Sequence, residues 1–212
     1  SSTGQEFKIY RPTFKEFILN MKRGPQIIYP KDISQIVIES NISSSSKVLE
    51  IGTGSGALTL YLVSILNEKG SLTTVDISKT NQRRAKKTIE RYLSTKEINE
   101  EYNLKFINQD LNDFNFSEIS NEIDTVITDV PEPWIFFDNN KINTDIVWVS
   151  YLPSITQVIK TKECLESNNF ENIEVKEVIL RDWYLNKKIA RPDNKLISHT
   201  GFLLSARFIK FD

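Results

Sequence analysis

The chain has 212 residues, of which 39% are hydrophobic and 26% charged, and its formal net charge is −1. This length fits one domain with a substantial core, and the near-neutral charge excludes nucleic-acid binding through overall basicity, so that RNA would need local basic patches. The single cysteine excludes an internal disulfide framework and fits a reducing, cytoplasmic compartment. With one histidine and one cysteine, the sequence predicts no metal site. It contains no apolar run long enough for a membrane span and no signal peptide.

The N-terminal part of the chain predicts two helices. Thr13 and Glu16 have the spacing of a capping box, which predicts a first helix over 14–21. Asp32 is the predicted N-cap of a second helix over 33–38. We expect the first helix to pack on the core.

A strand, a glycine turn and a helix follow one another over residues 48–66. Gly52 can adopt backbone angles closed to other residues, and Gly54 and Gly56 let the main chain approach a ligand. Asp76 ends the next predicted strand, at a spacing from which a carboxylate reaches the ribose hydroxyls of a bound nucleoside. The alternative interpretation is a tight structural turn without a ligand.

Glu50 separates two classes of cofactor. Dinucleotide sites usually read G-x-G-x-x-G and leave the helix N-terminus open for a pyrophosphate. Here the spacing is G-x-G-x-G, and Glu50 stands two residues before the first glycine. Its carboxylate would repel a pyrophosphate but suits a cationic ligand, through an ammonium group or through water. The pattern favours S-adenosylmethionine over a dinucleotide and resembles the first motif of class I methyltransferases.

The remaining predicted elements are strands over 104–107, 123–128, 146–149, 173–180 and 202–211 and helices over 82–93 and 154–165. Strands that alternate with helices predict an α/β fold with a parallel, doubly wound sheet and a ligand over the carboxyl ends of the strands. We expect the last two strands to pair antiparallel and close the sheet. The first of these helices is basic, which favours a solvated surface, with RNA contact as the alternative.

Four loop residues are candidates for ligand contact. Asp110 follows the third strand and would lie beside an adenine ring and accept its amino hydrogen. Asp129 ends the fourth strand beside the expected methyl group, or caps the next helix. Trp134 follows two prolines and is either core filler or a platform for base stacking. Tyr29, which the following proline restricts, is either a buried core tyrosine or faces a substrate.

Taken together, these residues resemble the tRNA (adenine-N1)-methyltransferases that modify adenine 58 of the T-loop and, in some archaea, adenine 57. The likeness covers nearly the whole chain. The glycine motif is common to class I methyltransferases, whereas the D-x-P-x-P-W and H-T-G-F-L signatures are more specific. In chain order the motifs are Arg11-Pro12-Thr13, residues 26–32, residues 49–58, residues 129–134, Tyr151-Leu152-Pro153 with Gln157-Val158, Arg181-Asp182-Trp183, Arg191-Pro192 and His199-Thr200-Gly201-Phe202-Leu203.

The resemblance implies a Rossmann-like fold, with a mostly parallel seven-stranded sheet, helices on both faces and an antiparallel closing strand. It implies S-adenosylmethionine as cofactor, tRNA as partner and a homo-oligomer, a tetramer of paired dimers, in the cytoplasm without membrane or metal. The implied cofactor-binding residues are Glu50, Gly52, Gly54, Ser55, Gly56, Ala57, Asp76, Asn81, Asp110, Leu111 and Asp129. Asp129 is also the implied catalytic acid, and Tyr29, Trp134 and Tyr151 are the implied substrate-binding residues.

The chain departs from the family at its start. Relatives commonly carry a small β-rich domain before the Arg-Pro-Thr stretch, and only ten residues precede it here. We therefore predict that residues 1–30 form an N-terminal extension, a remnant of that domain or a link to it, and that 31–212 form the catalytic domain. Two other functions stay open: a methyltransferase for a small molecule such as a corrin precursor, and a non-catalytic tRNA-binding subunit, which should have lost the glycine turn or the loop acid.

Overall fold

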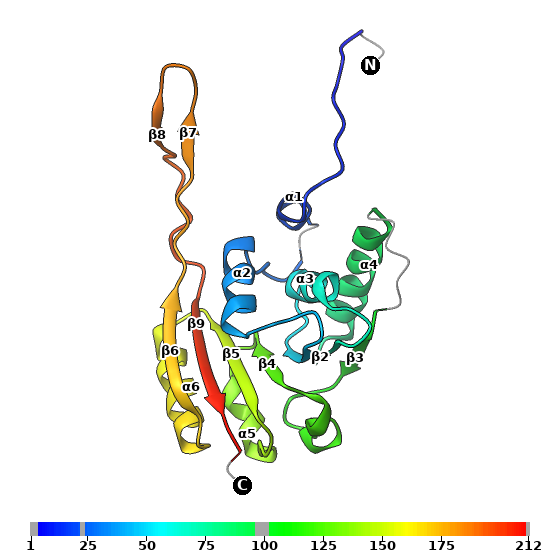
Figure 1. Ribbon diagram of the computed structural model, residues 1–212, viewed down its shortest axis with the longest axis vertical. Helices are drawn as coiled ribbons and strands as arrows, with labels where there is room; N and C mark the ends of the chain where they lie inside the picture. Colours follow the sequence, from blue (N-terminus) through cyan, green and yellow to red (C-terminus); the bar gives the residue numbers. More distant parts are fainter. Residues whose placement is uncertain (1–3, 22–23, 96–101, 211–212) are drawn as a thin grey trace.

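The computed structural model describes residues 4–21, 24–95 and 102–210. Its centre is a seven-stranded sheet in the order β3-β2-β1-β4-β5-β9-β6 (Figure 1). The strands are β1 Lys47–Ile51, β2 Ser71–Asp76, β3 Leu104–Asn108, β4 Thr125–Thr128, β5 Ile146–Leu152, β6 Glu171–Glu177 and β9 Phe202–Phe208. The first five pair in parallel, and β9 runs antiparallel to β5 and β6. The predicted sheet is confirmed, and its strand order reverses between β1 and β4.

The helices cover both faces of this sheet. They are α1 Phe14–Leu19, α2 Pro30–Glu39, α3 Ala57–Ile65, α4 Lys79–Thr95, α5 Phe136–Asn139 and α6 Ile155–Ser167, with 3₁₀ turns η1 Phe116–Glu118, η2 Ser120–Glu122 and η3 Pro133–Ile135. Val48 of β1 packs in a core with residues of α2, α3 and α4, whereas Leu49 packs in a second core with residues of α5 and α6. Successive strand residues point to opposite faces, so the apolar run of β1 serves both cores. In the described part of the chain, no helix is long and apolar enough to cross a membrane.

Two predictions on the N-terminal helices have different outcomes. The capping box of Thr13 and Glu16 is present at the start of α1. The prediction that Asp32 caps α2 is wrong, because the helix begins at Pro30 with Tyr29 as N-cap. Proline is favoured at the first helical position, where its missing N–H costs no hydrogen bond. Asp32 therefore lies inside the first turn, with a fully buried side chain.

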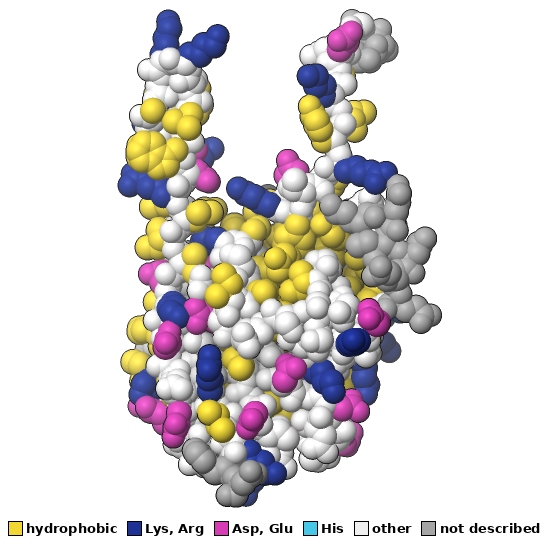
Figure 2. All heavy atoms as spheres, viewed as in Figure 1, with side chains coloured by type: hydrophobic (Ala, Val, Ile, Leu, Met, Phe, Trp, Pro, Cys, Tyr) yellow, Lys and Arg dark blue, Asp and Glu magenta, His cyan; other side chains and the backbone are white. Residues whose placement is uncertain are grey.

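Two segments extend away from this body. Residues 179–199, called the arm here, contain the short strands β7 Trp183–Leu185 and β8 Ala190–Pro192, which pair only with each other. The arm stands off the end of the sheet where β6 finishes and β9 begins, and the segment before α1 extends on the same side (Figure 1). Apolar side chains lie along both (Figure 2). The sequence predicts no strand between residues 180 and 202, so this hairpin was missed. Residues 1–3, 22–23 and Phe211, which fall within predicted segments, lie outside the described residues.

Candidate active site

A cavity of about 450 Å³ lies at the carboxyl ends of β1, β2 and β4. This is the point where the strand order reverses, and open α/β sheets bind ligands at such points. Seven residues predicted from the sequence to bind cofactor line it: Gly52, Gly54, Asp76, Asn81, Asp110, Leu111 and Asp129. The structure thus brings together residues from the ends of β1, β2, β3 and β4 and from the first turn of α4.

Gly52 allows the ends of β1 and β4 to approach each other. Its φ is +101°, and a Cβ added to it would lie 2.3 Å from the carbonyl oxygen of Asp129. No side chain fits at that distance. The backbone of Gly54, with φ +50°, lies beside the carboxylate of Asp129, since a Cβ there would be 4.0 Å from Oδ2. Glycine at these two positions opens the cavity and places the acid at its wall.

The later residues of the glycine turn do not line this cavity. A Cβ on Gly56 would lie 2.6 Å from Cβ of Ala85, so this glycine lets α3 and α4 pack closely. Ala57 is buried in the core. Ser55 lines a separate hollow beside α4. Ligand contact was expected of all three residues, and the turn alone could not separate backbone that faces a ligand from backbone that packs on a helix.

Asp76 fixes the glycine turn and also faces the cavity. Its Oδ2 accepts a hydrogen bond from the backbone N–H of Gly54 at 2.9 Å, and its Oδ1 accepts one from the N–H of Ser78 at 2.6 Å. Each carboxylate oxygen can accept a further hydrogen bond. The carboxylate can therefore hold the turn and bind a ligand hydroxyl at the same time.

Glu50 lies beneath the turn rather than in the cavity. Its side chain is 1% exposed, and its Oε2 accepts a hydrogen bond from the hydroxyl of Thr59 at 2.7 Å. Burial raises the pKa of Glu50 to about 8, and the charges of Asp129 and Asp76 add to the rise. Burial thus favours the protonated, neutral form of this side chain. Glu50 was expected to suit a cationic ligand, through an ammonium group or through water, and its side chain does not line the cavity.

The carboxylate of Asp129 is half-buried at the cavity wall. Within the described part of the chain, no side chain or backbone N–H donates a hydrogen bond to it. Burial raises the pKa of Asp129 to about 7, and the nearby charge of Asp76 adds to the rise. A carboxyl group in a cavity, with a pKa shifted by burial and by a like charge, is typical of functional sites.

The three aromatic residues expected to bind substrate have different positions. Tyr151 is buried, and its hydroxyl donates a hydrogen bond to the carbonyl of Thr200 at 2.7 Å. Burial raises the pKa of Tyr151, and electrostatic interactions with Asp32, Asp129 and Tyr29 add to the rise. Tyr29 and Asp129 are therefore near enough to Tyr151 to interact with it electrostatically. Trp134 is only half-buried and does not line the cavity. Lys160 Nζ lies 4.0 Å from its ring centroid.

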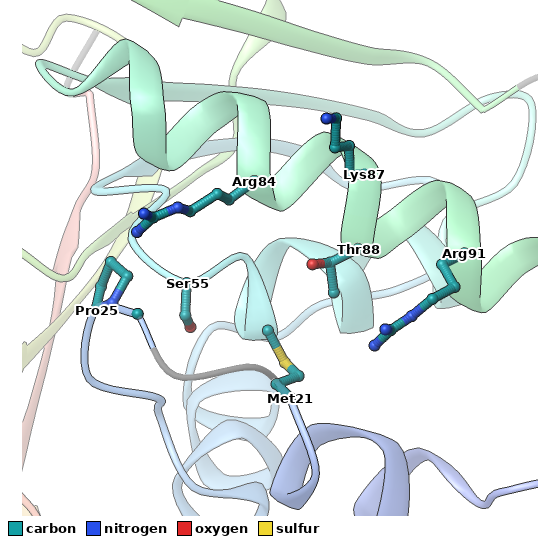
Figure 3. Close-up of a pocket in the computed structure, with 8 residues that line it drawn as sticks. Met21, Pro25, Ser55, Arg84, Lys87, Thr88 and Arg91 are labelled. Atoms are coloured by element: carbon teal, nitrogen blue, oxygen red, sulfur yellow. The ribbon is translucent and has the colours of Figure 1, made fainter.

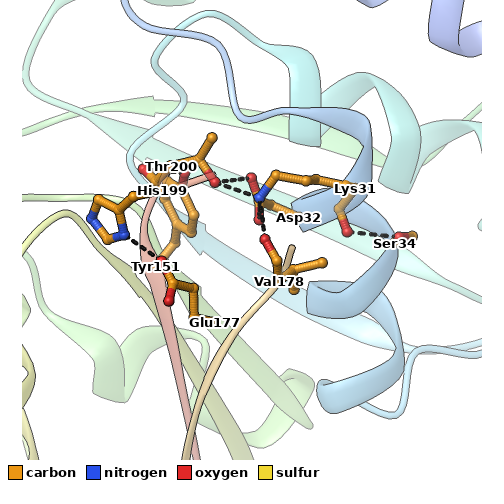
Figure 4. A network of polar contacts seen from close by, with 8 residues as sticks. All are labelled: Lys31, Asp32, Ser34, Tyr151, Glu177, Val178, His199 and Thr200. Carbon is orange, nitrogen blue, oxygen red and sulfur yellow. Dashed lines mark hydrogen bonds and ion pairs between the residues drawn. The ribbon is translucent and has the colours of Figure 1, made fainter. Parts of the chain in front are cut away.

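A buried polar network, whose roles sequence reasoning missed, holds Tyr151 in place (Figure 4). The Lys31 ammonium donates to Asp32 Oδ1 at 2.8 Å, to the carbonyl of Val178 at 2.7 Å and to Thr200 Oγ1 at 2.6 Å. The Thr200 hydroxyl donates to Asp32 Oδ2 at 2.7 Å. In the sequence, these residues were marked only by belonging to two motifs of the family pattern, Tyr-Pro-Lys-Asp and His-Thr-Gly. The network ties the base of the arm to α2 and to Tyr151.

His199 lies at the edge of this network. Its Nδ1 is 2.6 Å from Glu177 Oε1, and its Nε2 is 3.2 Å from the carbonyl oxygen of Pro153. The hydrogen bond to Glu177, with that to Pro153, raises the pKa of His199. These contacts join the arm to β6 and to the end of β5.

Comparison with known proteins gives consistent matches. The family described as "tRNA methyltransferase complex GCD14 subunit" matches residues 7–189. The tRNA (adenine(58)-N(1))-methyltransferase TrmI of Thermus thermophilus is 32% identical over 206 residues, 96% of this chain and 78% of the relative. The tRNA (adenine(57)-N(1)/adenine(58)-N(1))-methyltransferase TrmI of Methanocaldococcus jannaschii is also 32% identical, over 98% of this chain and 80% of the relative.

A solved structure agrees with these matches. The crystal structure of the tRNA (m1A58) methyltransferase TrmI from Aquifex aeolicus superposes with a TM-score of 0.78 and 31% identity, covering 95% of this chain and 78% of that one. The match thus extends from the N-terminal motifs to the closing strands. It includes the glycine turn and the loop acid Asp129, which line one cavity. The chain belongs to the GCD14 family of tRNA methyltransferase subunits, which includes the TrmI enzymes, and has their class I methyltransferase fold.

Proposed function

We propose that the chain transfers a methyl group from S-adenosylmethionine to N1 of a T-loop adenine in tRNA, at position 58 or at positions 57 and 58. The observation that carries the proposal is the unpaired Asp129 carboxylate at the wall of the glycine-lined cavity. The TrmI relatives, whose names specify adenine 58 or adenines 57 and 58, support the choice of substrate.

Two features of the cavity fit S-adenosylmethionine. The space beside Gly52 and Gly54 is open because neither residue has a Cβ, and the carboxylates of Asp76 and Asp129 give the cavity a negative potential that suits a cationic ligand. Asp76 and Asn81 would hold the ribose, and Asp110 and Leu111 the adenine. Hydrogen bonds from Asn112 lower the pKa of Asp110, which keeps it an ionised acceptor. The cofactor, when bound, supplies a methyl group already activated by its sulfonium.

In this proposal, Asp129 orients the target base. Its carboxylate accepts a hydrogen bond from the exocyclic amino group of the adenine, which directs N1 into the cavity and stabilises the positive charge that develops on the ring. Because N1 is otherwise paired in the tRNA, the base must be turned out of its stack, at a cost of roughly a few kcal/mol. Tyr151, held by the Lys31–Asp32 network, and Tyr29 would line the space that receives it.

We also propose a cytoplasmic homotetramer, with residues 1–30 as an N-terminal extension. The arm supports the assembly, since a two-stranded hairpin without a sheet or helix to pack on is marginally stable in water. Its residues Trp183, Tyr184, Leu185 and Ile189 are all exposed in the single chain. Apolar side chains gathered on a projecting element are typical of an interface.

The pH dependence of the reaction follows from Asp129. Because burial raises its pKa to about 7, the carboxyl is protonated below that pH and then cannot accept a hydrogen bond at its proton-bearing oxygen. We expect kcat/KM for tRNA to fall roughly tenfold per pH unit below about 7 and to level off above it. Initial rates between about pH 6 and pH 9, at saturating cofactor, measure this. A flat acidic limb would contradict the assignment.

Nucleoside mass spectrometry tests the function itself. Purified protein is incubated with S-adenosylmethionine and an unmodified tRNA transcript, and we expect 1-methyladenosine in the digest. Transcripts with guanosine at position 57, at position 58 or at both assign the site. Methylation of a corrin precursor but not of tRNA would favour the small-molecule enzyme. Binding of tRNA without binding of S-adenosylmethionine would favour the non-catalytic subunit.

A further inference from the structure

A second hollow, of about 410 Å³, lies beside α4 and touches the glycine turn at Ser55 (Figure 3). Its lining residues are Met21, Gly24, Pro25, Ser55, Arg84, Lys87, Thr88 and Arg91. Ser55 follows Gly54, which lines the first cavity, so a ligand in this hollow would lie one residue from the candidate active site. Nothing in the proposed methyl transfer uses this hollow.

Among the residues that the structure describes, three cations and no acid line the hollow. Arg84, Lys87 and Arg91 are spaced three and four residues apart, which puts them along one face of α4. Arg84 extends from the helix toward Pro25 and the glycine turn (Figure 3). Arg84 and Lys87 are exposed and form no ion pair or hydrogen bond with any residue of the described ranges. Unpaired like charges around one hollow are an arrangement that an anion stabilises.

The extent of the row favours a polymeric anion over a single small one. Seven residues of α-helix rise about 10 Å from Arg84 to Arg91, and one nucleic-acid strand carries a charge about every 3.4 Å of its axis. The row therefore spans about three successive phosphate spacings. The hydroxyls of Thr88, on the same helix, and of Ser55, on the glycine turn, add hydrogen-bond donors to the lining of the hollow. Since the whole chain has a net charge of −1, attraction of such a polymer needs a local cluster of cations, and this row supplies one.

We propose that Arg84, Lys87 and Arg91 bind the sugar-phosphate backbone of the substrate RNA next to the nucleotide whose base enters the catalytic cavity. This rests on the proposed function, which supplies the RNA. The sequence favoured a solvated surface for this basic helix, α4. The proposal assigns a binding role to one face of it only. Its other cations, such as Arg83 and Lys86, are equally exposed but do not line the hollow.

The test compares two double variants that remove equal charge from the same helix. R84Q/K87Q removes two cations of the hollow, and R83Q/K86Q removes two cations outside it. Arg91 stays, because its guanidinium lies 4.9 Å from the Phe17 ring centroid and its loss would disturb the packing of α1. Affinity for the tRNA transcript is measured by fluorescence anisotropy over a range of salt concentrations. Affinity for S-adenosylmethionine and the thermal unfolding midpoint report on the cofactor site and on folding.

We expect R84Q/K87Q to bind tRNA roughly tenfold more weakly and to lower the slope of log Kd against log salt by about one to two. R83Q/K86Q should stay within about twofold of the unmodified chain. Equal losses in both variants, or a wild-type affinity for R84Q/K87Q, would overturn the inference. If the unmodified chain neither binds nor methylates tRNA, the proposed function fails instead, and the two failures are distinguishable.

Discussion

Asp129→Asn should lower kcat for tRNA methylation by about 10²- to 10³-fold, the usual cost of losing one hydrogen-bonding group aimed at transition-state charge. Asparagine keeps the size of the side chain but loses the negative charge that strengthens the bond to the amino group. The change should affect the affinity for S-adenosylmethionine far less, because Asp76, Asn81, Asp110 and Leu111 remain in the cavity. Single-turnover kinetics on a tRNA transcript, together with cofactor binding by calorimetry, separate the two effects.

The same variant should not lose stability, which distinguishes a lost role from a lost fold. The pKa of Asp129 is about 7 in the folded chain, against an ordinary value near 4, because burial disfavours the charged form. Ionisation therefore costs folding free energy increasingly as the pH rises from about 4 to about 7, and the full cost applies above that. The neutral amide of Asp129→Asn would remove this cost, so the unfolding midpoint of the variant at about pH 8 should equal or exceed that of the parent chain.

A matched control for this substitution is Glu132→Gln. Glu132 is an exposed acid of the same loop that also lines the cavity, and no role is assigned to it. Its loss removes one negative charge near Asp129, so it reports the effect of local charge alone. Turnover of Asp129→Asn within a few-fold of the parent chain would remove Asp129 from the mechanism. An equal loss in both variants would attribute the effect to local charge and not to a hydrogen bond.

The parallel sheet could be predicted because its signals are local. Apolar runs such as Val48 to Ile51 end in glycine or an acid, and helical periods follow them, so both the parallel sheet and its ligand-binding edge come from pattern alone. The position of Asp129 near Asp76 follows from the same rule, because the carboxyl ends of parallel strands lie along one edge of the sheet. This part of the site needed no knowledge of side-chain packing.

Other features depended on packing, burial or the pairing of very short strands and could not be predicted. In the sequence, Gly56 looks equivalent to Gly52 and Gly54. In the structure, glycine is required at this position because Ala85 of α4 leaves no space for a Cβ. Glu50 resembles a ligand-binding acid in the sequence, yet its side chain is buried and bonded to threonine hydroxyls, among them that of Thr59, and burial raises its pKa. The arm was missed because its short strands pair only with each other and carry no long alternating pattern. Only the contact of Gly56 with Ala85 joins residues far apart in the sequence. Thr59 is nine residues from Glu50, and the two strands of the arm are neighbours in the chain, so what the pattern did not show there was the burial of Glu50 and the pairing of two very short strands.

Asp32→Ala should lower the free energy of unfolding by about 3–5 kcal/mol, the usual cost of removing one partner of a buried ion pair. The side chains of Asp32 and Lys31 are 0% and 7% exposed, so the substitution leaves an ammonium without its counter-charge in the protein interior. Lys31 also donates to Val178 and Thr200, and the carbonyl of Thr200 holds the Tyr151 hydroxyl. Tyr151 should therefore lose its fixed position when the network is broken, and urea unfolding at constant protein concentration measures the loss of stability.

The exposed pair of Lys162 and Glu166 on α6 is the matched control, because it joins the same two kinds of charge with about half of each side chain in solvent. Glu166→Ala should change the unfolding free energy by less than about 1 kcal/mol, since water replaces what an exposed partner provides. The difference between the two variants isolates burial as the cause. A loss below about 1 kcal/mol for Asp32→Ala would mean that the network does not support the fold. The Lys31 ammonium would then have to reach solvent when its partner is removed, and the arm and Tyr151 would need another anchor.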